Sequence, residues 1–138
     1  MMKPFNDQSI IASEPLMFTH RSKDASITRY FALLGMGDPL CLFLGNYDHY
    51  CYITGRWTDL QIKAEICDYY TKIELEPNNL PTLGANGTIY KTDVIKRFVY
   101  DDYFFDIDVV AIIARESPRY FAKVHTGIIH IHTTSWRG

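Results

Sequence analysis

The chain lacks an apolar run long enough for a membrane-spanning helix. Its longest runs, residues 40–44 and 109–114, are far shorter than the roughly 20 residues that a span requires. Residues 1–20 contain Asp7, Glu14 and two prolines, a composition that fits neither a signal peptide nor a transit peptide. Basic residues are not in excess either, with 14 Lys and Arg against 16 Asp and Glu. A net charge of −2 argues against nucleic acid as a partner, because such proteins need a basic face.

Cysteine is also scarce. Cys41, Cys51 and Cys67 are odd in number and have no Cys-x-x-Cys spacing, so neither a disulfide framework nor a zinc site is indicated. We expect three buried, reduced thiols and a cytoplasmic location, with any membrane attachment at the inner face. A phosphate-binding loop, a dinucleotide fingerprint and a Ser-His-Asp order are absent as well.

What the chain has is an α/β pattern of strands and helices in 138 residues, enough for one core and no more than one domain. Residues 10–20 predict one extended strand interrupted at Pro15, a residue typical of an edge or a bulge. Residues 26–34 predict a helix capped by Ser26. Residues 46–55 read as irregular. The further predictions are a short helix near Pro39, a strand over residues 69–75, helices over residues 92–98 and from residue 106, and strands over residues 120–125 and 128–132.

Asp106 and Asp108 open a helix that is apolar almost all round and should therefore be buried. Capping alone explains an Asp at such a position in many helices. Because Tyr103, Phe104 and Phe105 precede it, a carboxylate here would be partly desolvated, and a desolvated carboxylate can act as a general base. Residues two apart do not share a helix face, so the pair is a poor two-oxygen metal clamp.

His130 and His132 alternate along a predicted strand and would project from the same face, where two imidazoles can bind a divalent metal. Most such pairs are simply solvated or hydrogen-bonded histidines. One histidine acting with an upstream carboxylate is the simpler hypothesis.

Two further segments offer ligand contacts. Gly84, Asn86 and Gly87 lie in a small-residue loop whose backbone could approach a ligand closely, although a plain turn explains it equally well. The aromatic segment 46–52 and Trp57 offer rings that can stack on sugars, and Asp48 can accept hydrogen bonds from hydroxyls. Packing should account for most of these rings.

With these residues assembled, the chain resembles a family 2 glycosyltransferase of the GT-A type. The resemblance rests on the order of several segments, which are residues 11–16, 29–41, 44–48, 54–58, 80–87, 106–108 and 127–130. It implies that residues 1–138 are the C-terminal, acceptor-side part of a single GT-A domain. The fold would be a partial mixed sheet flanked by helices, lacking the N-terminal nucleotide-binding strands and the metal-binding Asp-x-Asp.

The resemblance also implies the chemistry. A sugar would move from a nucleotide-sugar donor to a glycan or lipid-linked acceptor with inversion, and Asp106 would be the general base. Phe105 stands where the family often has an acidic residue. His130 resembles a ligand of Mg²⁺ or Mn²⁺, and substrate contacts fall on Asp48, Trp57, Gly84, Asn86, Gly87 and Asp108. We expect the isolated chain to be inactive, and to pair with a separate N-terminal half or to self-associate through an exposed sheet edge.

Two other functions remain open. A small metal-dependent hydrolase would require Asp106, Asp108, His130 and His132 to converge. A non-catalytic module would bind glycans or a partner subunit through Tyr47, Tyr50, Tyr52 and Trp57.

Overall fold

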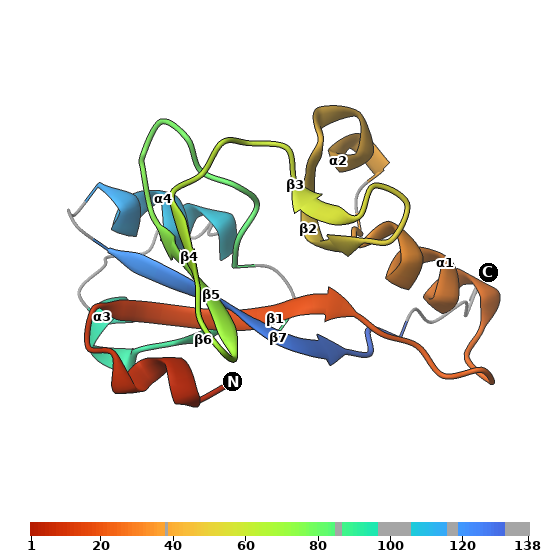
Figure 1. The fold of residues 1–138 in the computed structure, drawn as a ribbon, viewed down its shortest axis with the longest axis horizontal. Helices are drawn as coiled ribbons and strands as arrows, with labels where there is room; N and C mark the ends of the chain where they lie inside the picture. The colour runs from red at the N-terminus through yellow and green to blue at the C-terminus, as the bar shows by residue number, and fades with distance from the viewer. Residues whose placement is uncertain (38, 85–86, 97–105, 116–118, 132–138) are drawn as a thin grey trace.

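The computed structural model describes residues 1–37, 39–84, 87–96, 106–115 and 119–131 (Figure 1). They form a mixed α/β fold with a five-stranded sheet of order β4-β5-β7-β1-β6 and a separate antiparallel pair, β2-β3. The strands are β1 (Ile10–Phe18), β2 (Asn46–Cys51), β3 (Arg56–Thr58), β4 (Ala64–Ile66), β5 (Tyr70–Glu74), β6 (Ile89–Tyr90) and β7 (Tyr120–Ile128). The helices are η1 (Lys3–Asn6), α1 (Ser26–Leu34), α2 (Pro39–Leu44), α3 (Thr92–Ile95) and α4 (Asp106–Ala114).

The centre of the large sheet is the parallel pair of β1 and β7, which runs from Ile10 beside Tyr120 to Phe18 beside Ile128. Pro15 lies at a register shift in this pair, so the predicted bulge is confirmed. The strand is continuous and lies between β7 and β6 in the sheet. Proline is tolerated there because β6 pairs only with Ala12 and Ser13, so Pro15 removes no hydrogen bond from that side.

The hydrophobic core lies on one face of this sheet, beneath α3 and α4. Ile73 of β5 pairs with Phe121 of β7, and both side chains are fully buried against Val110 and Ile113 of α4. Helix α4 begins at Asp106, as predicted, and its residues Val109, Val110, Ile113 and Ala114 enter this core. The prediction that this helix is buried is therefore confirmed for its second half.

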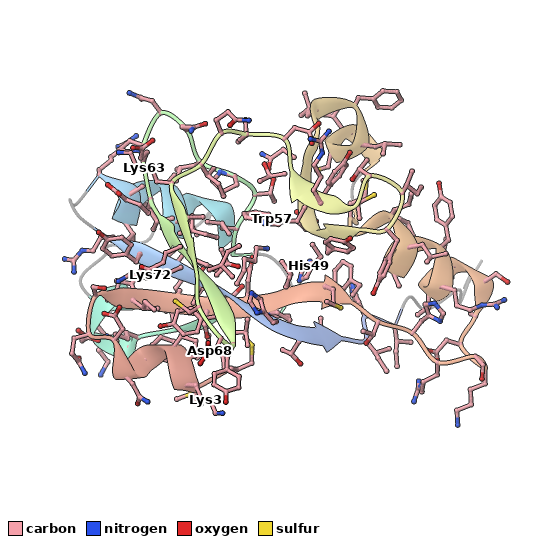
Figure 2. The ribbon with its side chains drawn as sticks, viewed as in Figure 1. Lys3, His49, Trp57, Lys63, Asp68 and Lys72 are labelled. Atoms are coloured by element: carbon pink, nitrogen blue, oxygen red, sulfur yellow. The ribbon has the colours of Figure 1, made fainter. Side chains whose placement is uncertain are left out.

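The opposite face of the sheet carries charged residues. Lys72 alternates with Ile73 along β5 and so points away from the core. Its ammonium group forms an ion pair of 2.6 Å with Asp7, which follows η1, and lies 4.2 Å from the centre of the Tyr120 ring. This pair ties the N-terminal turn to the sheet (Figure 2).

The small sheet and helices α1 and α2 gather at the end of the molecule toward which β1 and β7 point (Figure 1). Helix α1 begins at Ser26 as predicted, but Ser26 is its first residue and not its cap. It ends at Gly35, whose φ of 69° is left-handed and whose carbonyl accepts a hydrogen bond from the His49 amide. Residues 46–55 were expected to be irregular. They instead form β2 and a tight turn, because the backbone of β2 pairs with β3.

Three further expectations need correction. Residues 120–128 form one strand, β7, in place of the two strands predicted over residues 120–125 and 128–132. Gly127 lies inside β7, opposite Met17. The strand ends at Ile128, so His130 does not lie on it, and His132 is outside the described residues. Of the three thiols only Cys51 is buried, whereas Cys41 and Cys67 are half-buried; all three are free. No helix in the described parts is both long and apolar enough to cross a membrane.

Candidate functional site

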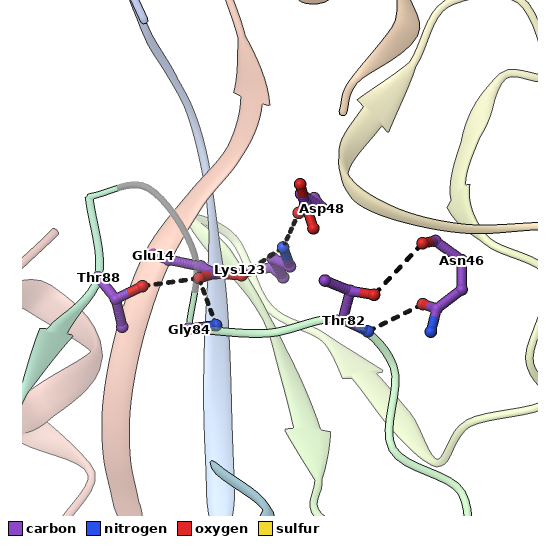
Figure 3. Close-up of polar contacts among 7 residues, drawn as sticks. All are labelled: Glu14, Asn46, Asp48, Thr82, Gly84, Thr88 and Lys123. Carbon is purple, nitrogen blue, oxygen red and sulfur yellow. Dashed lines mark hydrogen bonds and ion pairs between the residues drawn. The ribbon is translucent and has the colours of Figure 1, made fainter. Parts of the chain in front are cut away.

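An ion pair between Glu14 of β1 and Lys123 of β7 lies beside the core, where β2 approaches the large sheet (Figure 3). The two residues are direct neighbours across the parallel pair, so their side chains emerge on the same face. Both side chains are fully buried, with relative exposures of 1% and 0%. Buried charges of this kind are tolerated only when they are paired and hydrogen-bonded.

Glu14 holds the loop that precedes β6. Its Oε2 accepts a hydrogen bond of 2.9 Å from the amide of Gly84 and one of 2.8 Å from the hydroxyl of Thr88 (Figure 3). Gly84 and Gly87 both have positive φ, at 92° and 87°. Glycine is needed for such a backbone, and one carboxylate fixes the loop at both ends.

Lys123 holds the small sheet in a similar way. Its ammonium group donates a hydrogen bond of 2.5 Å to the main-chain oxygen of Asp48 on β2. It also lies 4.5 Å from the centre of the Trp57 ring on β3, a cation–π contact. Trp57 is half-buried and packs against the core as well. Lys123 therefore sets the position of both strands of the small sheet relative to the large one.

Burial raises the pKa of the Glu14 carboxyl above its ordinary value, whereas the charge and hydrogen bond of Lys123 and the hydrogen bonds from Thr88 and Gly84 act in the opposite direction. The three donors satisfy the carboxylate, so the ionised pair is the arrangement that the geometry favours. Loss of any donor would shift the balance toward the protonated acid.

A second contact joins the same two segments. The side-chain oxygen of Asn46 accepts a hydrogen bond of 2.8 Å from the amide of Thr82, whose hydroxyl in turn donates to the main-chain oxygen of Asn46 at 3.3 Å. The start of β2 and the loop before β6 are thus tied together directly as well as through Glu14 and Lys123 (Figure 3).

His49 follows Asp48 on β2 (Figure 2), and its ring is stacked 3.9 Å from the ring of Phe18 at the end of β1. It is completely buried, and neither ring nitrogen has a hydrogen-bond partner among the described residues. Burial, followed by the charges of Lys123 and His130, lowers the pKa of His49 to about 2. His49 is therefore a neutral imidazole at every physiological pH.

Helix α4 lies beside the large sheet (Figure 1), and Val109, Val110 and Ile113 hold its second half in the core. Asp106 is the first residue of this helix. The side chains of Asp106 and Asp108 are outside the described part of the structure.

The structure brings together three of the residues predicted to bind substrate. Asp48, Trp57 and Gly84 come from three separate segments and all contact Lys123 or Glu14. The Asp48 carboxylate, expected to bind hydroxyls, is buried and accepts a hydrogen bond of 3.4 Å from the Gly37 amide.

Gly87 has no direct contact of this kind and lines a groove with Pro15 and Ile128. Asn86 lies outside the described residues. The substrate roles of all these residues stay predictions.

The predicted metal ligand His130 lies beyond the end of β7, with its ring 5.7 Å from that of Phe18. Within the described ranges, no three His, Cys, Asp or Glu side chains are grouped closely enough to hold a metal ion. His130 therefore belongs to no such group of three within those ranges, and a full ligand set for Mg²⁺ or Mn²⁺ would have to include residues outside them.

Glu14 and Lys123 were not among the residues predicted from the sequence. Each is the one Asp, Glu, Lys or Arg of its strand, and that is the signal that could have identified them. Their opposite signs, on two different predicted strands, were consistent with a buried pair.

Comparisons with protein-family models, with curated proteins and with solved structures find no match to this chain.

Proposed function

We propose that this chain forms the acceptor-side part of a glycosyltransferase that transfers a sugar from a nucleotide-sugar donor to a glycan or lipid-linked acceptor. With a lipid-linked acceptor, the reaction would take place at the inner face of the membrane. The observation that carries the proposal is the convergence of Asp48, Trp57 and Gly84 on the buried Glu14–Lys123 pair.

This convergence supports a binding site because it is held rigidly. A sugar site needs an aromatic ring for stacking and fixed polar groups for its hydroxyls. Trp57 supplies a half-buried ring, held by Lys123, and the 84–88 loop supplies backbone groups held by Glu14. Glu14 and Lys123 are positioning residues in this proposal, because both are buried and act through the segments that they hold.

The catalytic step of the proposal belongs to Asp106. Its carboxylate would accept the proton of an acceptor hydroxyl while that oxygen attacks the anomeric carbon in line, with inversion. The packing of α4 supports this role, since Val109, Val110 and Ile113 hold the helix in the core on the large sheet. A base so placed gains from proximity as well as from a tuned pKa.

A divalent ion with His130 among its ligands would neutralise the charge of the departing nucleoside diphosphate. The residues of this chain would bind and orient the acceptor and remove its proton.

The test begins with the DNA upstream of the Met1 codon. If an open frame there encodes aliphatic strands and an Asp-x-Asp pair, the product of the complete frame is assayed for release of nucleoside diphosphate. The assay uses a panel of nucleotide sugars, glycan acceptors and Mg²⁺ or Mn²⁺. We expect Asp106→Asn to abolish turnover, and Trp57→Phe to raise the KM for acceptor with a smaller effect on kcat.

Full activity of Asp106→Asn would refute the proposed base. Glycan binding without nucleotide binding, lost in Trp57→Ala and retained in Asp106→Asn, would favour the non-catalytic module. The thermal unfolding of each variant is measured in parallel, because Trp57 also packs against the core.

A further inference from the structure

Strand β4 lies at one edge of the large sheet, with β5 on its inner side. Its three residues, Ala64, Glu65 and Ile66, are all exposed, and the Ile66 side chain is 82% exposed. The backbone of such an edge is a template on which a further strand can pair. The question is therefore which strand the sequence of β4 fits.

The hydrogen bonds between β4 and β5 show which backbone groups face outward. The amide of Cys67 donates a hydrogen bond of 2.8 Å to the main-chain oxygen of Tyr70, so Cys67 directs its backbone groups toward β5. Bonded and non-bonded residues alternate along an antiparallel strand, so Glu65 is bonded to β5 as well. The amide and carbonyl groups of Ala64 and Ile66 therefore point to the outer edge of the sheet.

Opposite charges flank the centre of this edge. Lys63 and Glu65 lie on either side of Ala64 and, being two residues apart, project from the same face of the strand. The Lys63 side chain is 66% exposed although it pairs with Glu76, and Glu65 is exposed as well. A lysine and a glutamate in this spacing make the edge complementary to an antiparallel copy of itself.

The position of the symmetry axis follows from these charges. A two-fold axis through Ala64 lets the Ala64 residues of two copies exchange a pair of hydrogen bonds, because their backbone groups face outward. It also sets Lys63 of each copy opposite Glu65 of the other. An axis through Glu65 would set two glutamates opposite each other, and one through Lys63 would set two lysines opposite each other. Axes through Ile62 or Ile66 would move the opposite charges out of register.

We propose that β4 pairs with β4 of a second copy of this chain about a two-fold axis through Ala64, so that the two large sheets join into one. This inference goes beyond the proposed function and does not depend on it. The two Lys63–Glu65 pairs would occupy the closely spaced, non-hydrogen-bonded positions of the new ladder, and Ile66 would face Ile62 of the other copy. The contact is small, so the dissociation constant should be on the order of 100 µM.

The experiment is sedimentation velocity of the full chain over a concentration series from about 10 µM to about 1 mM. We expect the wild type to pass from monomer to dimer and Ala64→Pro to stay monomeric throughout. The proline removes an amide that faces the outer edge, and an edge strand accepts a proline at such a position. Ala64→Ser keeps the amide and should dimerise as the wild type does. Circular dichroism checks that each variant is folded.

Charge reversal tests the register. Lys63→Glu and Glu65→Lys each set two like-charged pairs across the axis, so each should weaken the dimer by about tenfold. An equimolar mixture of these two variants should dimerise about as well as the wild type, because a heterodimer again sets opposite charges against each other at both positions. Lys23→Glu is the matched control, since it makes the same change of charge at an exposed residue outside β4, and it should leave the dimer unchanged.

A wild type that stays monomeric over the whole series would overturn the inference. A dimer that persists in Ala64→Pro would overturn it as well, because the two copies would then meet through another surface. If the mixture of Lys63→Glu and Glu65→Lys stays monomeric while the wild type dimerises, the axis does not pass through Ala64, and the proposed pairing is wrong.

Discussion

Removal of Lys123 should destabilise the fold far more than removal of the Glu14–Lys123 pair as a whole. In Lys123→Met, the Glu14 carboxylate stays fully buried without its cation, and Asp48 and Trp57 lose their contact with the ammonium group. Breaking one side of a buried ion pair costs about 3–5 kcal/mol. We expect a loss of that size in the free energy of unfolding.

The double variant Glu14→Leu with Lys123→Met removes both charges together. Its remaining costs are the Gly84 amide, which loses its acceptor at about 1–3 kcal/mol, and the main-chain oxygen of Asp48, which loses its donor as it does in Lys123→Met. The double variant should therefore be more stable than Lys123→Met alone. The stability losses of Glu14→Leu and Lys123→Met, added together, should exceed the loss in the double variant by about 3 kcal/mol or more.

Urea unfolding at pH 7, followed by circular dichroism, measures all four proteins of this cycle. Lys63→Met is the surface control. Lys63 is paired with Glu76 at 2.5 Å, but its side chain is 66% exposed, so the urea midpoint of this variant should hardly differ from that of the wild type. If the losses of Glu14→Leu and Lys123→Met simply add, the two residues do not act as a pair, and the structural account of the site fails.

Three further predictions concern stability. The low pKa of His49, about 2, keeps it neutral in the fold, whereas the unfolded chain takes up a proton below about pH 6.5. This contribution to stability is complete above pH 6.5 and is lost as the pH falls. Urea unfolding should therefore show that wild type loses about 2 kcal/mol more than His49→Phe between pH 7 and pH 5. Equal losses in the two proteins would contradict the prediction. Gly35→Ala should cost about 2–4 kcal/mol in the same assay for two reasons. The alanine backbone would have to adopt a positive φ, and its Cβ would lie 2.6 Å from the main-chain oxygen of Tyr50. Gly37→Ala, with no atom within 4 Å of the added Cβ, should have little effect, and similar losses in the two would refute the argument. The hydrogen bond from Lys72, and then those from Ser9, lower the pKa of Asp7 to about 2, so its contribution is present above its ordinary value near 3.8 and is lost as the pH falls toward 2. Asp7→Asn should therefore be less stable by about 1 kcal/mol at pH 7 after allowance for solvent screening, with the difference vanishing near pH 2; a difference that persists at pH 2 would exclude the ionised pair as its cause.

Local patterns in the sequence located much of the secondary structure. The helix over residues 26–34, the break at Gly35 and the helix that begins at Asp106 could be predicted because apolar periodicity and a left-handed glycine act over a few residues. The bulge at Pro15 could be predicted for the same reason, since a proline cannot donate a backbone hydrogen bond whatever its partner strand.

Strand β2 shows where such reasoning ends. Asn46–Cys51 has no clear alternation of apolar and polar residues. Its burial does not alternate either, since Tyr47, Asp48 and His49 are buried in succession. The segment is a strand because β3 pairs with it and because Gly35 and Lys123 bind its backbone. These contacts come from other parts of the chain and leave no periodicity in the segment itself.

The candidate site divides in the same way. The sequence by itself determined its chemical groups, namely a ring at Trp57, a glycine loop at residues 84–87 and a carboxylate at the start of an apolar helix. Only the tertiary structure decided that Glu14 and Lys123 hold the ring and the glycine loop together. Those two residues are more than a hundred positions apart, and they meet because β1 and β7 are parallel neighbours in one register. The pairing of distant strands depends on burial and on backbone hydrogen bonds of the whole sheet, which no single segment specifies.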